Sequence, residues 1–371
     1  MGEHDGVAQE CPTGEDETRA VDQRAGSNSR VFTCHSGQCY AISAGAPTVA
    51  VGRANVDSPA MSSEQHAWVA GGLTYGITPP KLSYPEERRR ATAAAQAARI
   101  SALPVDGLVV YDLQDESSRT DVARPFPFLQ SIDPLDYAFD YLSEVPQQKI
   151  VYRSVSGQGR TELAAWLNRL AGCRGATVLV GAPSREQKMS LRLSEAYGIH
   201  RAAATRVPLG GVLIAERHET HGGEDERALR KVDHGCEFFI SQAVYSVTAS
   251  KNLLSDLYYR CQAEERSMPT VLVTLSPCGS EKTLAFMRWL GVSVPAWLSN
   301  ELVHAHDILE KSVDVSLAAF EELYEFAASK GIPLGCNVES VSLRKAEIDA
   351  SVDMVHRVAK ILGRGETQAS S

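Results

Sequence analysis

The sequence predicts a (β/α)₈ barrel preceded by an N-terminal extension. Eight short apolar segments alternate with helix-like segments between residues 70 and 362, an order typical of helices packed around a parallel sheet. The apolar segments are continuous runs, which indicates strands covered on both faces. A doubly wound open sheet shows the same alternation, so counting elements does not exclude it.

The expected strands are rich in β-branched and aromatic residues, and they cover residues 73–77, 107–111, 149–155, 176–181, 211–216, 238–245, 270–276 and 333–341. The expected helices cover residues 83–102, 136–142, 161–170, 189–197, 224–233, 249–264, 281–290, 297–329 and 345–362. In the first helix, Ser83 is a candidate N-cap and Pro85 suits the first turn.

Composition divides the chain into four parts. Residues 1–30 are dominated by Gly, Glu, Asp, Arg and Ser, which is typical of a disordered tail. Residues 31–69 form an extension to which the sequence assigns no fold. Residues 70–365 form the predicted barrel, and residues 366–371 form a C-terminal tail.

The overall charge argues against some classes of function. The 371 residues carry a formal net charge of −9, whereas nucleic-acid binding needs a basic surface. No apolar run has the length of a membrane span, and the N-terminus has no signal-peptide core. We therefore expect a cytoplasmic protein with a small-molecule partner, and the sequence leaves a homo-oligomer open.

Eight cysteines without a secretory context indicate reduced thiols rather than a disulfide framework. Cys34 and Cys39, with His35 between them, look like half of a metal site. No second pair with suitable spacing follows, so we expect free thiols and no metal.

Gln242 is an amide near the carboxyl end of an otherwise apolar strand. The carboxyl ends of barrel strands hold the chemistry in this fold class, and an amide suits the edge of a heterocycle. A buried amide can equally satisfy a neighbouring backbone group. The strand alone leaves both interpretations open.

Five segments, taken in chain order, form a recognisable set: residues 73–80 (LTYGITPP), 119–120 (RT), 230–235 (RKVDHG), 239–245 (FISQAVY) and 292–297 (VSVPAW). Together they resemble the methylenetetrahydrofolate reductase family. The resemblance implies a (β/α)₈ barrel that binds FAD, takes hydride from NAD(P)H and acts on a tetrahydrofolate derivative.

The resemblance also implies roles for individual residues. Gln242 would hydrogen-bond the pterin, with Tyr245 and Tyr111 as further substrate contacts. Arg230 and Lys231 would face the FAD diphosphate, although a basic pair at a helix end also suits the helix dipole.

Three positions depart from the family pattern. Gly76 stands where the first strand carries the catalytic Glu, and Ala182 follows Gly181 where the family has an Asp that binds the pterin. Arg153 stands near the place of the third-strand His beside the flavin, and we expect it at the cofactor site. A general acid needs a titratable group within reach of the reacting atom, so another carboxylate has moved in or the chemistry has changed.

Glu216, at the end of the fifth expected strand, and Glu339, in the eighth, are candidate replacements for the missing acid. A buried carboxylate is costly unless it is paired. Arg217 and Arg344 are the candidate partners if the two carboxylates are structural, and the sequence leaves both roles open.

Three further residues are candidates for the site. His218 is a candidate acid–base or flavin contact, with a loop histidine as the alternative. Glu281, after the seventh strand, is another candidate replacement for the missing acid. Asp112, after the second strand, is an additional pocket candidate.

The expected function is a methylenetetrahydrofolate reductase-like reduction of a folate-bound one-carbon unit. Folate-dependent one-carbon transfer without net reduction is an alternative, and a non-catalytic folate- or flavin-binding subunit is another. Fold resemblance does not decide among them.

Overall fold

The computed structural model describes residues 30–35, 38–43, 72–117, 121–181, 191–203 and 206–364. Contacts divide the chain into two units, residues 1–60 and residues 61–371. In the first unit, β1 (Arg30–His35) and β2 (Gln38–Ser43) pair antiparallel, with Cys34 opposite Cys39. Apart from Arg30, the tail expected at residues 1–30 lies outside the described residues.

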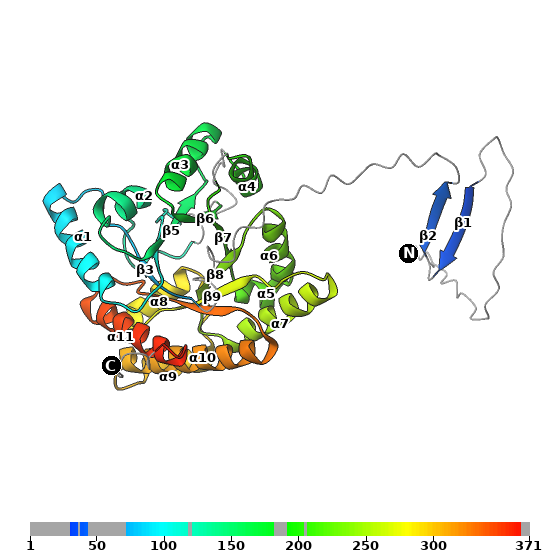
Figure 1. Ribbon diagram of the computed structural model, residues 1–371. Helices are drawn as coiled ribbons and strands as arrows, with labels where there is room; N and C mark the ends of the chain where they lie inside the picture. Colours follow the sequence, from blue (N-terminus) through cyan, green and yellow to red (C-terminus); the bar gives the residue numbers. More distant parts are fainter. Residues whose placement is uncertain are drawn as a thin grey trace, which may run out of the picture. The chain divides into compact units, whose positions relative to one another are not determined.

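The second unit is a closed barrel of eight parallel strands, which confirms the predicted (β/α)₈ fold (Figure 1). The strands are joined in chain order, and the last closes on the first. They are β3 (Leu73–Ile77), β4 (Gly107–Val110), β5 (Gln148–Ser154), β6 (Ala176–Val180), β7 (Leu209–Leu213), β8 (Phe238–Ala243), β9 (Thr270–Leu275) and β10 (Leu334–Glu339).

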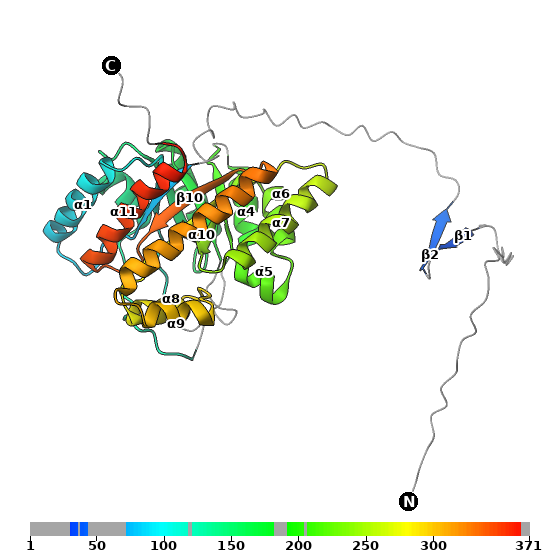
Figure 2. The same ribbon diagram turned by 90° about the horizontal axis from the view of Figure 1, so that it is seen from below.

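The helices surround these strands, and α8 and α9 lie together at one end of the barrel (Figure 2). They are α1 (Glu86–Ser101), α2 (Pro134–Asp136), the π-helix η3 (Tyr137–Tyr141), α3 (Arg160–Gly172), α4 (Leu193–Ala202), α5 (Ala215–His221), α6 (Glu224–Asp233), α7 (Val247–Ala263), α8 (Glu281–Trp289), α9 (Ala296–Val303), α10 (Ile308–Lys330) and α11 (Lys345–Ile361). Among the described helices, none has the length and apolar character to cross a bilayer.

Side chains alternate along each strand between the barrel interior and the layer under the helices, as the pleat requires. One apolar cluster fills the interior: Val109, Ile150, Tyr152, Ala176, Val178, Phe238, Ile240 and Leu272. The intervening strand residues, such as Leu108, Val151 and Phe239, belong to the larger core between strands and helices. Burial on both faces explains why the strands are continuous apolar runs.

Several element boundaries differ from the sequence-based prediction. The fifth barrel strand ends at Leu213, so Glu216 lies in the first turn of α5 instead of at a strand end. Pro85 rather than Ser83 occupies the N-cap position of α1. The helical region expected at 297–329 is two helices, because the Asp307 side chain accepts hydrogen bonds from the backbone and starts α10 anew.

We expect Gly335→Ala to lower the free energy of unfolding by about 1–3 kcal/mol, the usual range for overpacking. A Cβ at Gly335, inside β10, would lie 2.4 Å from the Gly72 carbonyl oxygen and 2.6 Å from Leu272 Cδ2. Gly198→Ala is the control, since that exposed helical position has open space and should gain about 0.5–1 kcal/mol. Urea unfolding measures both, and equal stability of the two variants would contradict this account of the packing.

Candidate functional site

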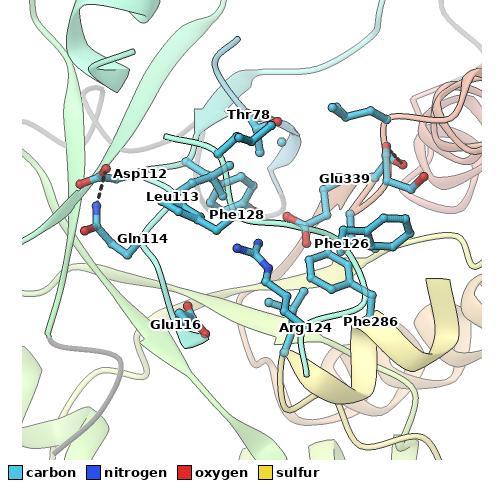
Figure 3. A pocket seen from close by; sticks show the side chains of 18 of the residues that line it. Thr78, Asp112, Leu113, Gln114, Glu116, Arg124, Phe126, Phe128, Phe286 and Glu339 are labelled. Atoms are coloured by element: carbon cyan, nitrogen blue, oxygen red, sulfur yellow. Dashed lines mark hydrogen bonds between the residues drawn. The ribbon is translucent and has the colours of Figure 1, made fainter. Parts of the chain in front are cut away.

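A cavity of about 840 Å³ opens at the carboxyl ends of β3, β4, β5, β6 and β10 (Figure 3). The strand ends contribute Gly76, Tyr111, Tyr152 and Glu339 to its wall. The position is that of active sites in this fold class, and the volume suits a ligand the size of a cofactor.

A polar network crosses the barrel where β10 closes on β3. Tyr111 donates a hydrogen bond to the Glu339 carboxyl group. Asn337 Nδ2 in turn donates to the Tyr111 hydroxyl oxygen at 3.0 Å, and the Thr74 hydroxyl donates to Asn337 Oδ1 at 2.8 Å. Nearly every polar atom in this buried hydrogen-bond network has a partner. The network therefore fixes the orientation of the Glu339 and Tyr111 side chains.

Gly76 provides the space that this arrangement needs. It is paired in register with Glu339 across the β3–β10 seam. A Cβ at Gly76 would lie 2.9 Å from Tyr111 Cε2 and 3.0 Å from Glu339 Cβ. The space beside Gly76 is therefore occupied by the Tyr111 side chain and by Cβ of Glu339.

Burial disfavours the charged form of Glu339 and raises the pKa of its carboxyl group to about 7, although the Tyr111 hydrogen bond opposes the shift. The pKa of Tyr111 is raised well above its ordinary value, first by burial and then by the negative charge of Glu339. At neutral pH, Glu339 is thus divided between an acid and a carboxylate, while Tyr111 remains a hydroxyl donor.

Asp112 follows Tyr111 at the same cavity wall, where Gln114 holds its side chain (Figure 3). Gln114 Nε2 donates to Asp112 Oδ1 at 2.9 Å, and the Ser154 backbone N–H donates to Oδ2 at 2.8 Å. Burial raises the pKa of Asp112 in spite of these donors. Asp112 was among the expected pocket residues, and the structure places it there.

The opposite wall comes from the long segment between β4 and α2 and from α8. Arg124, Phe126 and Phe128 of that segment line the cavity together with Phe286 and Trp289 of α8. The Trp289 indole N–H donates to the Val122 carbonyl at 2.9 Å, which ties the segment to the helix. The sequence analysis did not identify this wall. The sequence pattern that could have indicated it is an Arg followed by alternating Pro and Phe in an unusually long loop.

Gln242 lies beside the cavity, behind one of the residues that line it. Its Nε2 donates to the carbonyl of Leu290, a lining residue, at 3.0 Å, and its Oε1 is buried without a partner among the described residues. The ladder between β8 and β9 shifts register between Ile240 and Ala243, next to Gln242. Tyr245 is buried, does not line the cavity, and donates to the Ser276 carbonyl at 2.7 Å.

The remaining acid–base candidates lie outside the cavity lining. Glu216 is buried in α5 with Oε1 unpartnered among the described residues, and burial raises its pKa to about 7. His218 contacts two carboxylates of the helix layer, with Nε2 3.0 Å from Asp256 and Nδ1 3.6 Å from Asp225. Glu281 starts α8 and is exposed.

The two arginines expected to pair with Glu216 and Glu339 have other partners in the structure. Arg217 pairs with Glu224 rather than with Glu216. Arg344 lines the cavity and lies 3.8 Å from Glu347, not against Glu339.

The three cations predicted at the cofactor site already have partners. Arg230 is exposed and lies 3.6 Å from Glu226, and Lys231 Nζ donates to the Val212 carbonyl at 2.6 Å. Arg153 pairs with Asp133 at 2.8 Å and donates to Gln158. None of the three lines the cavity, so these residues do not fit a flavin diphosphate there.

Two segments of the family pattern, Arg119-Thr120 and the position of Ala182, lie outside the described residues. Within the described ranges, no group of three or more His, Cys, Asp or Glu side chains is arranged to hold a metal ion.

Comparison with solved structures gives an informative relative. No protein-family model and no curated protein matches the chain. An uncharacterized protein from Clostridium thermocellum that binds two copies of 5-methyl-5,6,7,8-tetrahydrofolic acid is 42% identical, with a TM-score of 0.72 over 80% of this chain and 98% of that chain.

More distant barrels also match. A GH113 β-1,4-mannanase is 12% identical, with a TM-score of 0.45 over 80% of this chain and 99% of that chain. An F420-dependent secondary alcohol dehydrogenase is 12% identical, with a TM-score of 0.47 over 79% and 99%. These similarities are too low to carry an argument.

The raised pKa of Glu339 makes stability depend on pH. Because the folded protein holds this proton up to about pH 7 and the unfolded chain releases it near 4.5, the native state binds more protons in that interval. The contribution of Glu339 to stability is therefore fully present below about pH 4.5 and is lost as the pH rises towards 7, by on the order of 3 kcal/mol for a shift of this size. We expect Glu339→Gln to remove this pH-dependent loss of unfolding free energy. Urea unfolding at several pH values measures it.

Glu216→Gln is the comparison variant, because its carboxyl has a similarly raised pKa away from the cavity. We expect each single variant to flatten the pH dependence and the double variant to flatten it further. A Glu339→Gln profile parallel to that of the wild type would show that Glu339 titrates normally.

Proposed function

Because the chain belongs to the same family as the methyltetrahydrofolate-binding protein from Clostridium thermocellum, we propose that its barrel cavity binds a reduced folate. The shared region spans nearly all of that protein. The cavity lies at the carboxyl ends of the barrel strands, where ligands bind in this fold class. The proposal is thus attached to a specific part of the molecule.

The inner end of the cavity suits a pterin. A pterin edge carries both donors and acceptors, and a carboxyl group that titrates near neutrality matches either kind. Glu339 and Asp112 supply carboxyl groups, and the Tyr111 and Tyr152 rings, with centroids 4.8 Å apart, supply an apolar face. Flat heterocycles bind such mixed surfaces well.

The observation that carries a catalytic role is the position of Glu339 beside Gly76. The methylenetetrahydrofolate reductase family, which the sequence resembles, uses an acid from its first barrel strand. In this protein β10 supplies a carboxyl group at the seam where it pairs with the first barrel strand, β3. A group with a pKa near the working pH is effective at giving and taking protons. We assign Glu339 as the general acid–base for chemistry on the folate-bound one-carbon unit.

The favoured reaction class is one-carbon chemistry without flavin, since the cations predicted to hold FAD are engaged elsewhere. Reduction by NAD(P)H is the second candidate, because Glu339 occupies the place of a reductase acid. Mixing the protein with NADH and 5,10-methylenetetrahydrofolate while following the nicotinamide absorbance separates the two. Oxidation of NADH that requires the folate would favour the reductase.

We expect binding of 5-methyltetrahydrofolate near pH 7 to be accompanied by proton uptake. A ligand over Glu339 would remove remaining water from a half-ionised carboxyl group and raise its pKa further. Isothermal titration calorimetry in buffers of different ionisation enthalpy measures the uptake and the stoichiometry together. Proton uptake should disappear in Glu339→Gln and persist in Glu216→Gln.

The outcomes of this titration separate the two parts of the proposal. No heat of binding to the wild type would sink the folate site itself. Binding with equal proton uptake in the wild type and in Glu339→Gln would remove Glu339 from the site while leaving the folate proposal intact.

We expect Gln242→Ala to weaken folate binding by more than tenfold, about 1.4 kcal/mol or more. Its amide holds the Leu290 carbonyl at the cavity wall, so its loss would let this part of the wall move. Gln148→Ala is the matched control, because that amide also holds a backbone carbonyl, of Arg174, but at the amino end of β5. Unchanged affinity in Gln242→Ala would exclude a role in the site.

A further inference from the structure

The cavity contains an arginine, Arg124, with two buried nitrogens that have no hydrogen-bonded partner among the described residues. Nε and Nη1 of Arg124 are buried, and neither has an acceptor among the described residues. The side chain points into the cavity (Figure 3). A buried donor without an acceptor costs about 1–3 kcal/mol, and more for a charged group, so this arrangement favours a ligand that supplies an acceptor.

Aromatic rings hold the guanidinium group in place. Its central carbon lies 5.1 Å from the Trp289 ring centroid, 5.3 Å from that of Phe128 and 5.4 Å from that of Phe286. Phe126 packs edge-on against Phe286, with centroids 5.2 Å apart. Cation–π contacts use the charge of the guanidinium group and none of its N–H donors, so a ligand can still accept hydrogen bonds from it.

The charges around Arg124 do not replace a direct partner. Asp115 and Glu116 act on it electrostatically, whereas burial lowers its pKa. Within the described ranges, no carboxylate lies within ion-pair distance of it. The other cavity arginine, Arg344, differs in this respect, since it donates to the Gly279 carbonyl and lies beside Glu347.

We propose that Arg124, together with Phe126, Phe128, Phe286 and Trp289, forms a subsite for an aromatic group that carries a carboxylate. In a reduced folate this is the benzoylglutamate end, so the assignment rests on the proposed function. The aromatic side chains receive the ring, and the guanidinium group binds a carboxylate in the two-pronged geometry that suits it.

The subsite also gives the ligand a direction. Arg124 belongs to the segment between β4 and α2, whereas Glu339 ends β10, so the two groups line the cavity from different elements and can contact different parts of one ligand. The pterin is directed towards Glu339 and Tyr111, and the acidic tail towards the loop after β4 and α8. A cation at one end and a titrating acid at the other disfavour the reverse orientation.

The test compares three probes in calorimetry: 5-methyltetrahydrofolate, 6-methyltetrahydropterin and p-aminobenzoylglutamate. We expect Arg124→Gln to weaken 5-methyltetrahydrofolate and p-aminobenzoylglutamate by about ten- to a hundredfold, the loss of one charge-assisted contact. Affinity for 6-methyltetrahydropterin, which lacks the acidic tail, should not change. Arg124→Lys should restore part of the loss, because it keeps the charge without the planar fork.

Arg230→Gln is the control, because Arg230 is exposed, lies beside Glu226 and does not line the cavity. It should change none of the three affinities by more than about twofold, the level at which surface charge pairs act. Equal weakening of all three probes in Arg124→Gln, without rescue by Arg124→Lys, would mean that Arg124 only supports the wall and would overturn the subsite. Unchanged affinity for both acidic probes would overturn it as well.

The test also distinguishes this inference from the folate proposal. Arg124-dependent binding of p-aminobenzoylglutamate without binding of either pterin would support the subsite and contradict the folate assignment. Binding of 5-methyltetrahydrofolate that is insensitive to Arg124→Gln would do the opposite. Failure of the wild type to bind any probe would contradict both.

Discussion

The site depends on the seam at which β10 closes on β3. Thr74 and Asn337, 263 positions apart in the chain, share a hydrogen bond there, and Asn337 passes the connection on to Tyr111 and Glu339. A carboxyl group in this place loses its hydration, and the Tyr111 hydrogen bond recovers only part of what water supplied. The raised pKa of Glu339 is therefore a consequence of barrel closure.

The sequence predicted the barrel because both of its signals are local. Continuous apolar runs mark strands covered on both faces, and α6 occupies the predicted residues 224–233. Glu339 was identified as a candidate because it stands at the end of a strand in a fold class whose chemistry lies at strand ends.

The rest of the site could not be predicted because it depends on long-range contacts. Glu216 looked equivalent to Glu339, since the apolar run before it does not reveal that the strand ends at Leu213. Arg124 lies in a segment without periodicity, and only the fold shows that this segment packs against α8. The partners of Arg153 and Lys231 are likewise invisible in sequence.

The absence of a side chain at Gly76 and the position of Glu339 have the same steric cause. A side chain at position 76 would occupy the space that now holds Tyr111 Cε2 and Glu339 Cβ. Two carboxylates in register across the seam would in addition repel each other at low dielectric. The seam therefore accommodates one carboxylate, from β3 or from β10 but not from both, and a Glu introduced at Gly76 would displace Glu339 and Tyr111 instead of adding a second acid.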